Sequence, residues 1–308
     1  MKNIAFIFPG QGFQKVGMGK DFYENFSSSK AIYDRANELL GFNLTDVMFN
    51  GPKEKLDQTL FSQLAIFVNS IAILKAIQEK YPEITPKICA GLSLGEYSAI
   101  FAANKLSFDE LLFLIQKRAN FMQKACQNNK GTMAAIINLD LDIIKDVIKD
   151  FEDVWIANIN TFSQIVISGK KESIEKVCLV LKEKGARRAL LLDVEGAFHS
   201  PYMKKAQENL KDEILKTNFV NSDIDLIMNV TADSFQDTSN LKTNLIKQVS
   251  STIRWADTIK KMDEKIDLFI EIGSKSLTNM NRKMGITAKS ISIETISDLK
   301  ELDDALQK

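Results

Sequence analysis

The segment 91–96, Gly-Leu-Ser-Leu-Gly-Glu, constrains the fold more than any other part of the chain. It follows a short apolar run at 88–90 and precedes a helix-like run at 97–103. A G-x-S-x-G turn between a buried strand and a helix exposes the serine hydroxyl at the end of the strand. The two glycines let the helix and the neighbouring strands approach the turn closely. The pattern predicts a strand, a sharp turn and a helix, with Ser93 as candidate nucleophile; a serine that merely caps a helix is the alternative.

The only histidine of the chain, His199, is the one base that serine chemistry of this kind could use. It lies in Gly-Ala-Phe-His-Ser-Pro at 196–201, between a strand-like run at 189–194 and a helix-like run that begins at Tyr202. Loops at strand ends carry catalytic groups more often than other segments do. The competing interpretation is a surface histidine or a core histidine with its hydrogen bonds satisfied.

A glycine-rich turn follows the first predicted strand, at 4–8, and reads Pro-Gly-Gln-Gly at 9–12. Such a turn can present backbone amides to a ligand. The G-x-G-x-x-G pattern of dinucleotide sites would need glycine where Lys15 stands, and the G-x-x-x-x-G-K-[ST] pattern has no match here. The sequence therefore does not support nucleotide binding.

Several further segments occur together with these and carry a family resemblance. They are Phe-Pro-Gly-Gln-Gly at 8–12, Gln-Lys-Arg at 116–118, Asn-Ile-Asn at 158–160, Gln-Ile-Val-Ile-Ser-Gly at 164–169 and Asn-Val-Thr at 229–231. Gln248 stands seven residues before Trp255. In this order, with the serine and histidine segments, they resemble the malonyl-CoA:acyl carrier protein transacylases over nearly the whole chain.

The resemblance implies an activity and a set of roles. Ser93 would accept the malonyl group of malonyl-CoA and pass it to the phosphopantetheine thiol of acyl carrier protein, which supplies fatty acid synthesis. His199 would act as general base and then as general acid. In this family a main-chain carbonyl, here that of Gln248, orients the histidine, and the amides of Gln11 and Leu94 form the oxyanion hole. If His199 titrates near its ordinary pKa of about 6.5, acylation should fall off below that pH.

Three residues are expected from the resemblance to bind substrate: Arg118, Phe198 and Asn160. Arg118 would hold the malonyl carboxylate, because a guanidinium can bond both oxygens at once. Without the resemblance, a solvated arginine on an amphipathic helix at 107–125 would be the favoured interpretation. Phe198 would crowd a 2-methyl branch, so malonyl is expected to be preferred over methylmalonyl.

The chain departs from the family pattern at several positions. Leu92 stands beside the serine where most relatives have histidine, and leucine cannot form a hydrogen bond. Phe162 and Ser163 replace a common Pro-Gly, and Thr252 replaces a common proline. The turn at 273–276 is shorter or poorer in glycine than usual. These differences affect loop shape, and we expect the reaction type to be kept.

The composition of the chain limits which classes of function remain. The 308 residues contain 40 basic and 40 acidic side chains, which gives no case for nucleic-acid binding. Cys89, Cys126 and Cys178 have neither disulfide nor zinc spacing, and reduced thiols fit a cytoplasmic enzyme. The first strand is too short for a signal peptide core, and the apolar run at 64–74 is too short to span a bilayer. We expect a monomer without metal or cofactor. Two candidate basic surfaces for an acidic carrier contain Lys182, Lys184, Arg187 and Arg188, and Lys204 with Lys205. The favoured alternative for both is an ordinary solvated face.

The alternation of predicted strands and helices indicates an α/β fold. Strand, helix, strand, strand, helix and strand follow one another between about 132 and 194, which is the ferredoxin-like βαββαβ order. We predict this small subdomain at 130–195, inserted into an α/β-hydrolase-like large subdomain with a mostly parallel sheet at 1–129 and 196–308. Runs at 226–230 and 268–272 are predicted as later buried strands.

Three function classes are separated by simple observations. A malonyltransferase, or an acyltransferase for another acyl-CoA, requires a covalent intermediate that moves to a carrier thiol. A serine esterase or thioesterase would use water as acceptor, and Arg118 would be unimportant. An inactive scaffold that binds acyl carrier protein would tolerate Ser93→Ala. The filled serine, histidine, arginine and glutamine positions favour the first class.

Overall fold

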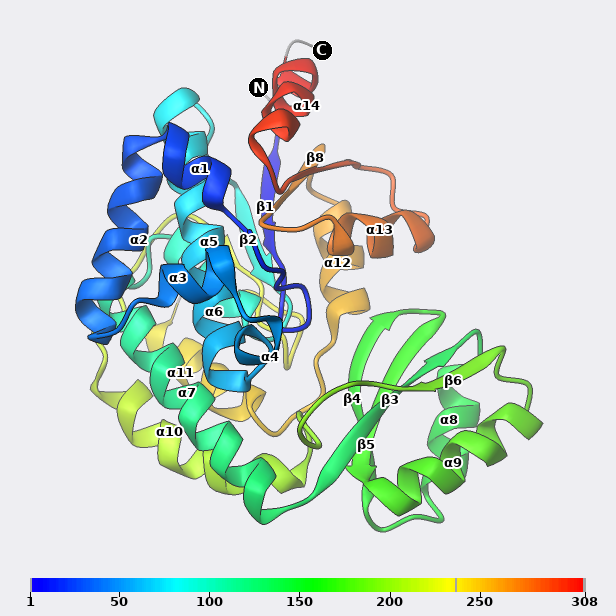
Figure 1. Ribbon diagram of the computed structural model, residues 1–308. Helices are drawn as coiled ribbons and strands as arrows, with labels where there is room; N and C mark the ends of the chain where they lie inside the picture. The colour runs from blue at the N-terminus through cyan, green and yellow to red at the C-terminus, as the bar shows by residue number, and fades with distance from the viewer. Residues whose placement is uncertain (1, 236, 307–308) are drawn as a thin grey trace.

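A five-stranded sheet forms the centre of the larger part of the molecule (Figure 1). The computed structural model describes residues 2–235 and 237–306. All pairs in this sheet are parallel. In spatial order the strands are β7 (Asp225–Leu226), β2 (Ile88–Gly91), β1 (Ile4–Phe8), β8 (Leu268–Ile272) and β9 (Lys289–Ile293). The chain adds strands on one side of β1 and then on the other, so a crevice forms at the carboxyl ends of the central strands.

Helices cover both faces of this sheet because successive side chains along each strand point into apolar clusters on opposite faces. Phe6 and Phe8 face the larger cluster, whereas Ala5 and Ile7 face the smaller one. The smaller cluster is covered by α12 (Trp255–Asp263) and α13 (Ser276–Lys283). The other helices around this sheet are α1 (Lys20–Asn25), α2 (Ser27–Leu40), α3 (Leu44–Asn50), α4 (Lys53–Leu56), α5 (Thr59–Lys80), α6 (Gly95–Ala102), α7 (Phe108–Asn128), α10 (Lys204–Lys216), α11 (Thr238–Gln248) and α14 (Leu299–Leu306).

Helix α5 is the central helix of the larger cluster. It has 22 residues, twice as many as the apolar run at 64–74 from which a helix was predicted. By length and composition alone it could cross a membrane. However, 83% of its apolar window is buried inside the molecule. It is therefore a core helix. Its apolar side chains are needed because the helix packs against α2, α6 and α7.

A second, antiparallel sheet lies beside the first (Figure 1). Its spatial order is β4 (Val154–Thr161), β5 (Gln164–Lys170), β3 (Gly131–Ile137) and β6 (Arg188–Leu191). Helices α8 (Leu141–Ile148) and α9 (Lys171–Glu183) cover one face and share an apolar core with it. The chain order of these elements is the predicted βαββαβ. The predicted fold class, a mostly parallel α/β sheet with a separate ferredoxin-like unit, is confirmed.

Two predicted strands needed correction, and one strand was missed. Strand β6 ends at Leu191 instead of residue 194, and β9 was not predicted. Strand β7 has only two residues, although the apolar run predicted a strand at 226–230. The chain turns back directly after β7, where the Met228 amide donates to the Asp233 carbonyl. This turn frees Asn229 to use its side chain elsewhere.

The small sheet is joined to the larger part of the molecule by hydrogen bonds between β4 and the segment that precedes α12. The Ile159 amide donates to the Ile253 carbonyl at 2.8 Å, and the Ile253 amide donates to the Ala157 carbonyl at 2.8 Å. The hydroxyl of Thr252 donates to the carbonyl of Ile156 at 2.7 Å. The threonine that departs from the family pattern thus contributes a bond between the small sheet and the larger part of the molecule.

Candidate active site

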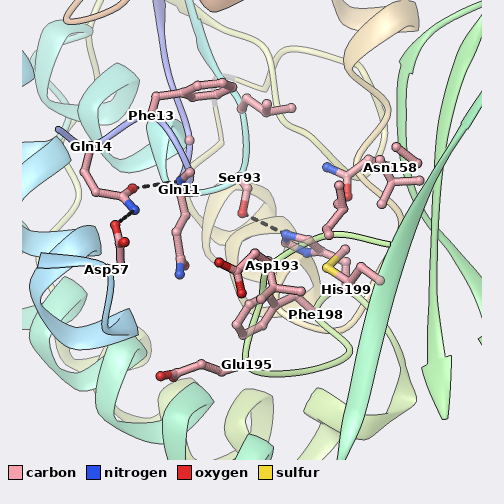
Figure 2. Close-up of a pocket in the computed structure, with 18 of the residues that line it drawn as sticks. Gln11, Phe13, Gln14, Asp57, Ser93, Asn158, Asp193, Glu195, Phe198 and His199 are labelled. Atoms are coloured by element: carbon pink, nitrogen blue, oxygen red, sulfur yellow. Dashed lines mark hydrogen bonds between the residues drawn. The ribbon is translucent and has the colours of Figure 1, made fainter. Parts of the chain in front are cut away.

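A pocket of about 720 Å³ lies between the carboxyl ends of the large sheet and the exposed face of the small sheet. Figure 2 shows that the Ser93 hydroxyl and the His199 ring point toward each other inside it. The pocket also contains Gln11, Arg118, Asn160 and Phe198 among its lining residues. The fold therefore brings Gln11 and His199, which are 188 positions apart in the sequence, to the same pocket.

Ser93 occupies the turn between β2 and α6, as predicted, with a φ of 53°. A non-glycine residue in this left-handed region is uncommon and needs support from its surroundings. Support comes from Asn229: its Oδ1 accepts from the Ser93 amide at 2.7 Å, and its Nδ2 donates to the Gly91 carbonyl at 2.7 Å. A Cβ on Gly91 would lie 2.0 Å from the Gly95 backbone, so the turn has room only for glycine there.

The hydroxyl of Ser93 is 2.8 Å from Nε2 of His199. On the other side of the ring, Nδ1 lies 2.9 Å from the carbonyl oxygen of Gln248. A carbonyl can only accept, so the proton resides on Nδ1, and the lone pair of Nε2 faces the serine. Gln248 is the last residue of α11, where helix carbonyls lack a partner within the helix. The arrangement can remove the hydroxyl proton.

His199 is buried, with 5% of its surface exposed, and this changes its titration. Burial and the positive charge of Arg118 lower its pKa to about 3, although the bond to the Gln248 carbonyl acts in the opposite direction. The condition for a fall in acylation below pH 6.5, a His199 pKa near its ordinary value, is therefore not met. The sequence could not show the depth of the ring or the nearby charge. The imidazole is neutral, and competent as a base, throughout the neutral range.

Arg118 lies on α7 and is only 1% exposed, so it is not a solvated helix arginine. Its Nη1 donates to Oε1 of Gln63 at 2.6 Å, and its Nη2 donates to Ser93 Oγ at 3.1 Å and to Oε1 of Gln248 at 3.2 Å. The guanidinium also lies over the ring of Tyr97, with Cζ 5.5 Å from the ring centroid. Burial lowers the pKa of Arg118, but an arginine keeps its proton in proteins. The site thus contains a cation whose direct partners are neutral.

The backbone amides of Gln11 and Leu94 lie at the two turns that end β1 and β2. In residues 2–235 and 237–306 neither amide donates a hydrogen bond. Leu94 is the N-cap of α6, where helix amides are free to bind an anion. Both amides therefore remain available, and the roles predicted for them stay predictions.

Two asparagines of β4 line the pocket because the strand is irregular. Register shifts occur between Ile156 and Asn158 and between Ile159 and Thr161. Ile156 and Ile159 consequently both pack on the small core, whereas Asn158 and Asn160 line the pocket. The Oδ1 atom of Asn160 is buried, and it accepts no hydrogen bond from the described part of the chain.

Three residues near the serine were not assigned roles from sequence: Gln63, Glu96 and Asn229. All three are fully buried. A buried polar residue needs hydrogen-bond partners, so Gln63 within the apolar helix α5 was a usable signal. Glu96 and Asn229 belong to motifs that carried the resemblance, but only the folded chain shows what they contact.

Leu92, the departure beside the serine, packs in the apolar cluster with α12 and α13 and is 6% exposed. The three cysteines are buried thiols, and burial raises the pKa of each. Cys89 is therefore unsuited to act as a thiolate. No group of three or more histidine, cysteine, aspartate or glutamate side chains within the described ranges is arranged to hold a metal ion.

The chain is similar to known proteins over nearly its full length. The model of the acyl transferase domain family matches residues 5–303. A malonyl CoA-acyl carrier protein transacylase of Bacillus subtilis is 39% identical over 313 residues, which cover 100% of this chain and 97% of the relative. The solved structure of a malonyl-transacylase in complex with its type II PKS acyl-carrier protein gives a TM-score of 0.95 at 30% identity. The match covers 98% of this chain and 99% of that chain. MCAT from Streptococcus pneumoniae gives 0.92 at 34% identity, covering 98% and 99%.

Proposed function

The chain belongs to the acyl transferase domain family, among its malonyl-CoA:acyl carrier protein transacylases, and we propose that Ser93, His199 and Arg118 carry out its reaction. The enzyme transfers a malonyl group from malonyl-CoA to the phosphopantetheine thiol of acyl carrier protein, for fatty acid synthesis. The observation that carries the residue roles is the contact between Ser93 Oγ and His199 Nε2, at 2.8 Å, beside a buried arginine.

In the first half-reaction, the hydroxyl of Ser93 attacks the thioester carbonyl while Nε2 of His199 takes its proton. The oxyanion receives hydrogen bonds from the amides of Gln11 and Leu94. Losing one such donor typically costs about 3 kcal/mol in the transition state. Collapse of the intermediate forms malonyl-Ser93, and the proton on His199 passes to the sulfur of the departing coenzyme A.

In the second half-reaction, the phosphopantetheine thiol enters the position that coenzyme A has left. Its proton passes to Nε2 of His199, and its sulfur attacks the ester carbonyl of malonyl-Ser93. The same two amides stabilise the second oxyanion. His199 then returns the proton to Ser93 Oγ, which restores the free enzyme. Such a sequence gives ping-pong kinetics.

Arg118 holds the malonyl carboxylate and thereby orients the thioester. Its support is the buried guanidinium 3.1 Å from Ser93 Oγ. Asn160 binds the acyl or pantetheine part through its unpartnered Oδ1. Phe198, a buried residue of the pocket next to His199, crowds a 2-methyl branch and favours malonyl over methylmalonyl. Comparable turnover of both thioesters would refute this last role.

The partners proposed are malonyl-CoA and holo acyl carrier protein, and the enzyme is proposed to act as a monomer. A cytoplasmic location is supported by three cysteines that remain thiols and by the burial of α5 within the core. Neither nucleic acid nor a membrane is expected to bind.

The test is intact-mass spectrometry of the wild type, Ser93→Ala and Arg118→Ala after incubation with malonyl-CoA or acetyl-CoA. A malonyl adduct should form on the wild type, should be absent from Ser93→Ala, and should transfer when holo carrier protein is added. Arg118→Ala should lose its preference for malonyl over acetyl. An adduct lost only to water would support an esterase instead, and no adduct at all would support a scaffold.

A further inference from the structure

Glu96 is a fully buried carboxylate next to the site that the reaction steps do not use. It is the second residue of α6, directly after the Gly95 that ends the serine motif. Burying a carboxylate is costly unless hydrogen bonds compensate for the lost water. Both of its oxygens accept hydrogen bonds, and each bond leads to a residue that holds part of the site.

The first bond leads to the serine turn. Oε1 of Glu96 accepts from the backbone amide of Asn229 at 2.7 Å. The side chain of Asn229 in turn accepts from the Ser93 amide and donates to the Gly91 carbonyl. Glu96 therefore fixes the residue that supports the left-handed backbone of Ser93.

The second bond leads to Gln248. Nε2 of Gln248 donates to Oε2 of Glu96 at 2.6 Å and to the Ser93 carbonyl at 2.7 Å. A carboxylate accepts hydrogen bonds and does not donate them, so it forces the NH₂ end of the amide toward itself. The amide oxygen must then point the other way, where it accepts from Nη2 of Arg118 at 3.2 Å. A reversed amide would direct its N–H groups at the guanidinium.

The placement of charge explains why an amide stands between the two ions. A carboxylate in direct contact with Arg118 would occupy the guanidinium and compete with an anionic substrate. With Gln248 between Glu96 and Arg118, the carboxylate lowers the cost of burying the guanidinium and leaves the substrate's binding position on the guanidinium free.

We propose that Glu96 is a positioning residue, which sets malonyl selectivity by orienting the Gln248 amide and thereby the Arg118 guanidinium. This inference rests on the proposed role of Arg118 as the carboxylate-binding residue. It predicts that removing the charge of Glu96 affects malonyl far more than acetyl, because an acetyl group has no carboxylate for Arg118 to hold.

The experiment compares Glu96→Gln with Glu271→Gln. Both change a fully buried carboxylate to an amide of the same size, but Glu271 contacts Ser274, Thr278 and Ser292, away from the pocket. Rates of malonyl and acetyl adduct formation on Ser93 are measured together with the melting temperature. Glu96→Gln should lower the malonyl-to-acetyl rate ratio about tenfold, the effect of one hydrogen bond to a charged group. Glu271→Gln should lower the melting temperature and leave the ratio unchanged.

A second pair of variants tests the route through Gln248. Gln248→Met removes the side-chain amide but keeps the main-chain carbonyl that holds His199. It should lower the ratio as Glu96→Gln does, and the double variant should be no worse than Gln248→Met alone. Additive losses, or an unchanged ratio in Glu96→Gln, would overturn the proposal.

Side-chain NMR signals of Arg118 and Gln248 give a readout that does not depend on turnover. They should shift in Glu96→Gln and remain in place in Glu271→Gln. Failure of the wild type to form a malonyl adduct would count against the proposed function, and the positioning role would still be decided by these signals. Unshifted signals would overturn it.

Discussion

At the scale of single residues, the direct partners of the Arg118 guanidinium determine the electrostatics of the site. They are neutral oxygens of Gln63, Gln248 and Ser93, and Arg118 forms no ion pair within the described part of the chain. Its positive charge is one cause of the lowered pKa of His199. A bound malonyl carboxylate would neutralise that charge and raise the pKa of His199. Substrate binding would thus make the histidine a better proton carrier at the step that needs one.

The pH dependence of acylation follows from the free-enzyme pKa of His199, which is about 3. Because kcat/KM reports the free enzyme, its acid limb should lie well below the ordinary histidine value of about 6.5. Acetyl transfer to Ser93, which does not depend on Arg118 or on the charge of Glu96, should therefore be flat from pH 7 to pH 5. Arg118→Gln removes the nearby cation, which raises the pKa of His199 and should move the acid limb upward. Single-turnover rates across this range provide the measurement, and a wild-type limb at 6.5 would contradict it.

At the scale of elements, the turn between β2 and α6 depends on how closely the backbones approach. A Cβ on Gly91 would lie 2.0 Å from the carbonyl of Gly95, and a Cβ on Gly95 would lie 2.2 Å from the carbonyl of Phe8. These neighbours are backbone atoms in the centre of the sheet, so they cannot rotate away. The helix must therefore start in contact with β1 and β2, which is what brings the Leu94 amide beside the pocket.

Gly91→Ala should destabilise the fold by about 3 kcal/mol, because the extra methyl group must separate the strand from the helix. Gly185→Ala is the matched control. Gly185 has a φ of +103°, and a Cβ there would meet nothing within 4 Å, so only backbone strain of about 1 kcal/mol is expected. Urea unfolding of both variants measures the difference. Equal losses would show that the close approach carries no cost.

Much of this architecture could be predicted at the level of elements. Strands β1 and β8 have the bounds that their apolar runs predicted, and the single histidine left only one partner for Ser93. The residues that Arg118, Gln63 and Glu96 contact could not be predicted. Each depends on contacts between segments far apart in the chain, and no local pattern records such contacts. The subdomain limits at 130 and 195, and the roles of the site residues, stay predictions.

At the scale of the whole molecule, two buried groups of the site affect stability with opposite signs. Burial lowers the pKa of His199 to about 3, so the unfolded state binds its proton first, and folding weakens as pH falls below about 6.5. Burial raises the pKa of Glu96 to about 7, so the folded state binds its proton first, and folding strengthens as pH falls from about 7 toward 4.5. Between pH 4.5 and 6.5 the two contributions nearly cancel.

Removing either group should leave the pH dependence of stability that the other group causes. From pH 7 to pH 5, the stability of His199→Gln should rise by roughly 2 kcal/mol relative to the wild type, and that of Glu96→Gln should fall by roughly 2 kcal/mol. Urea unfolding at the two pH values gives both differences. Shifts of the same sign in both variants would show that the two groups do not titrate as described.

The basic surface formed by Lys182, Lys184, Arg187 and Arg188 is exposed at the turn from α9 to β6. Acyl carrier proteins are acidic, so this surface could attract the second substrate. Changing Arg187 and Arg188 to glutamate should slow transfer from malonyl-Ser93 to the carrier and leave acylation by malonyl-CoA unchanged. Lys204→Glu with Lys205→Glu tests the second surface in the same way. Equal slowing of both half-reactions by a pair would remove that surface from consideration.

The two ends of the described chain lie side by side (Figure 1). Nζ of Lys2 donates to the carbonyl of Ala305 at 2.6 Å, at the start of β1, whereas the pocket opens at the opposite end of that strand. Additional polypeptide at either end would emerge away from the route that substrates take. The same catalytic unit could therefore serve as a separate enzyme or as one link of a larger fused polypeptide, with its chemistry unchanged.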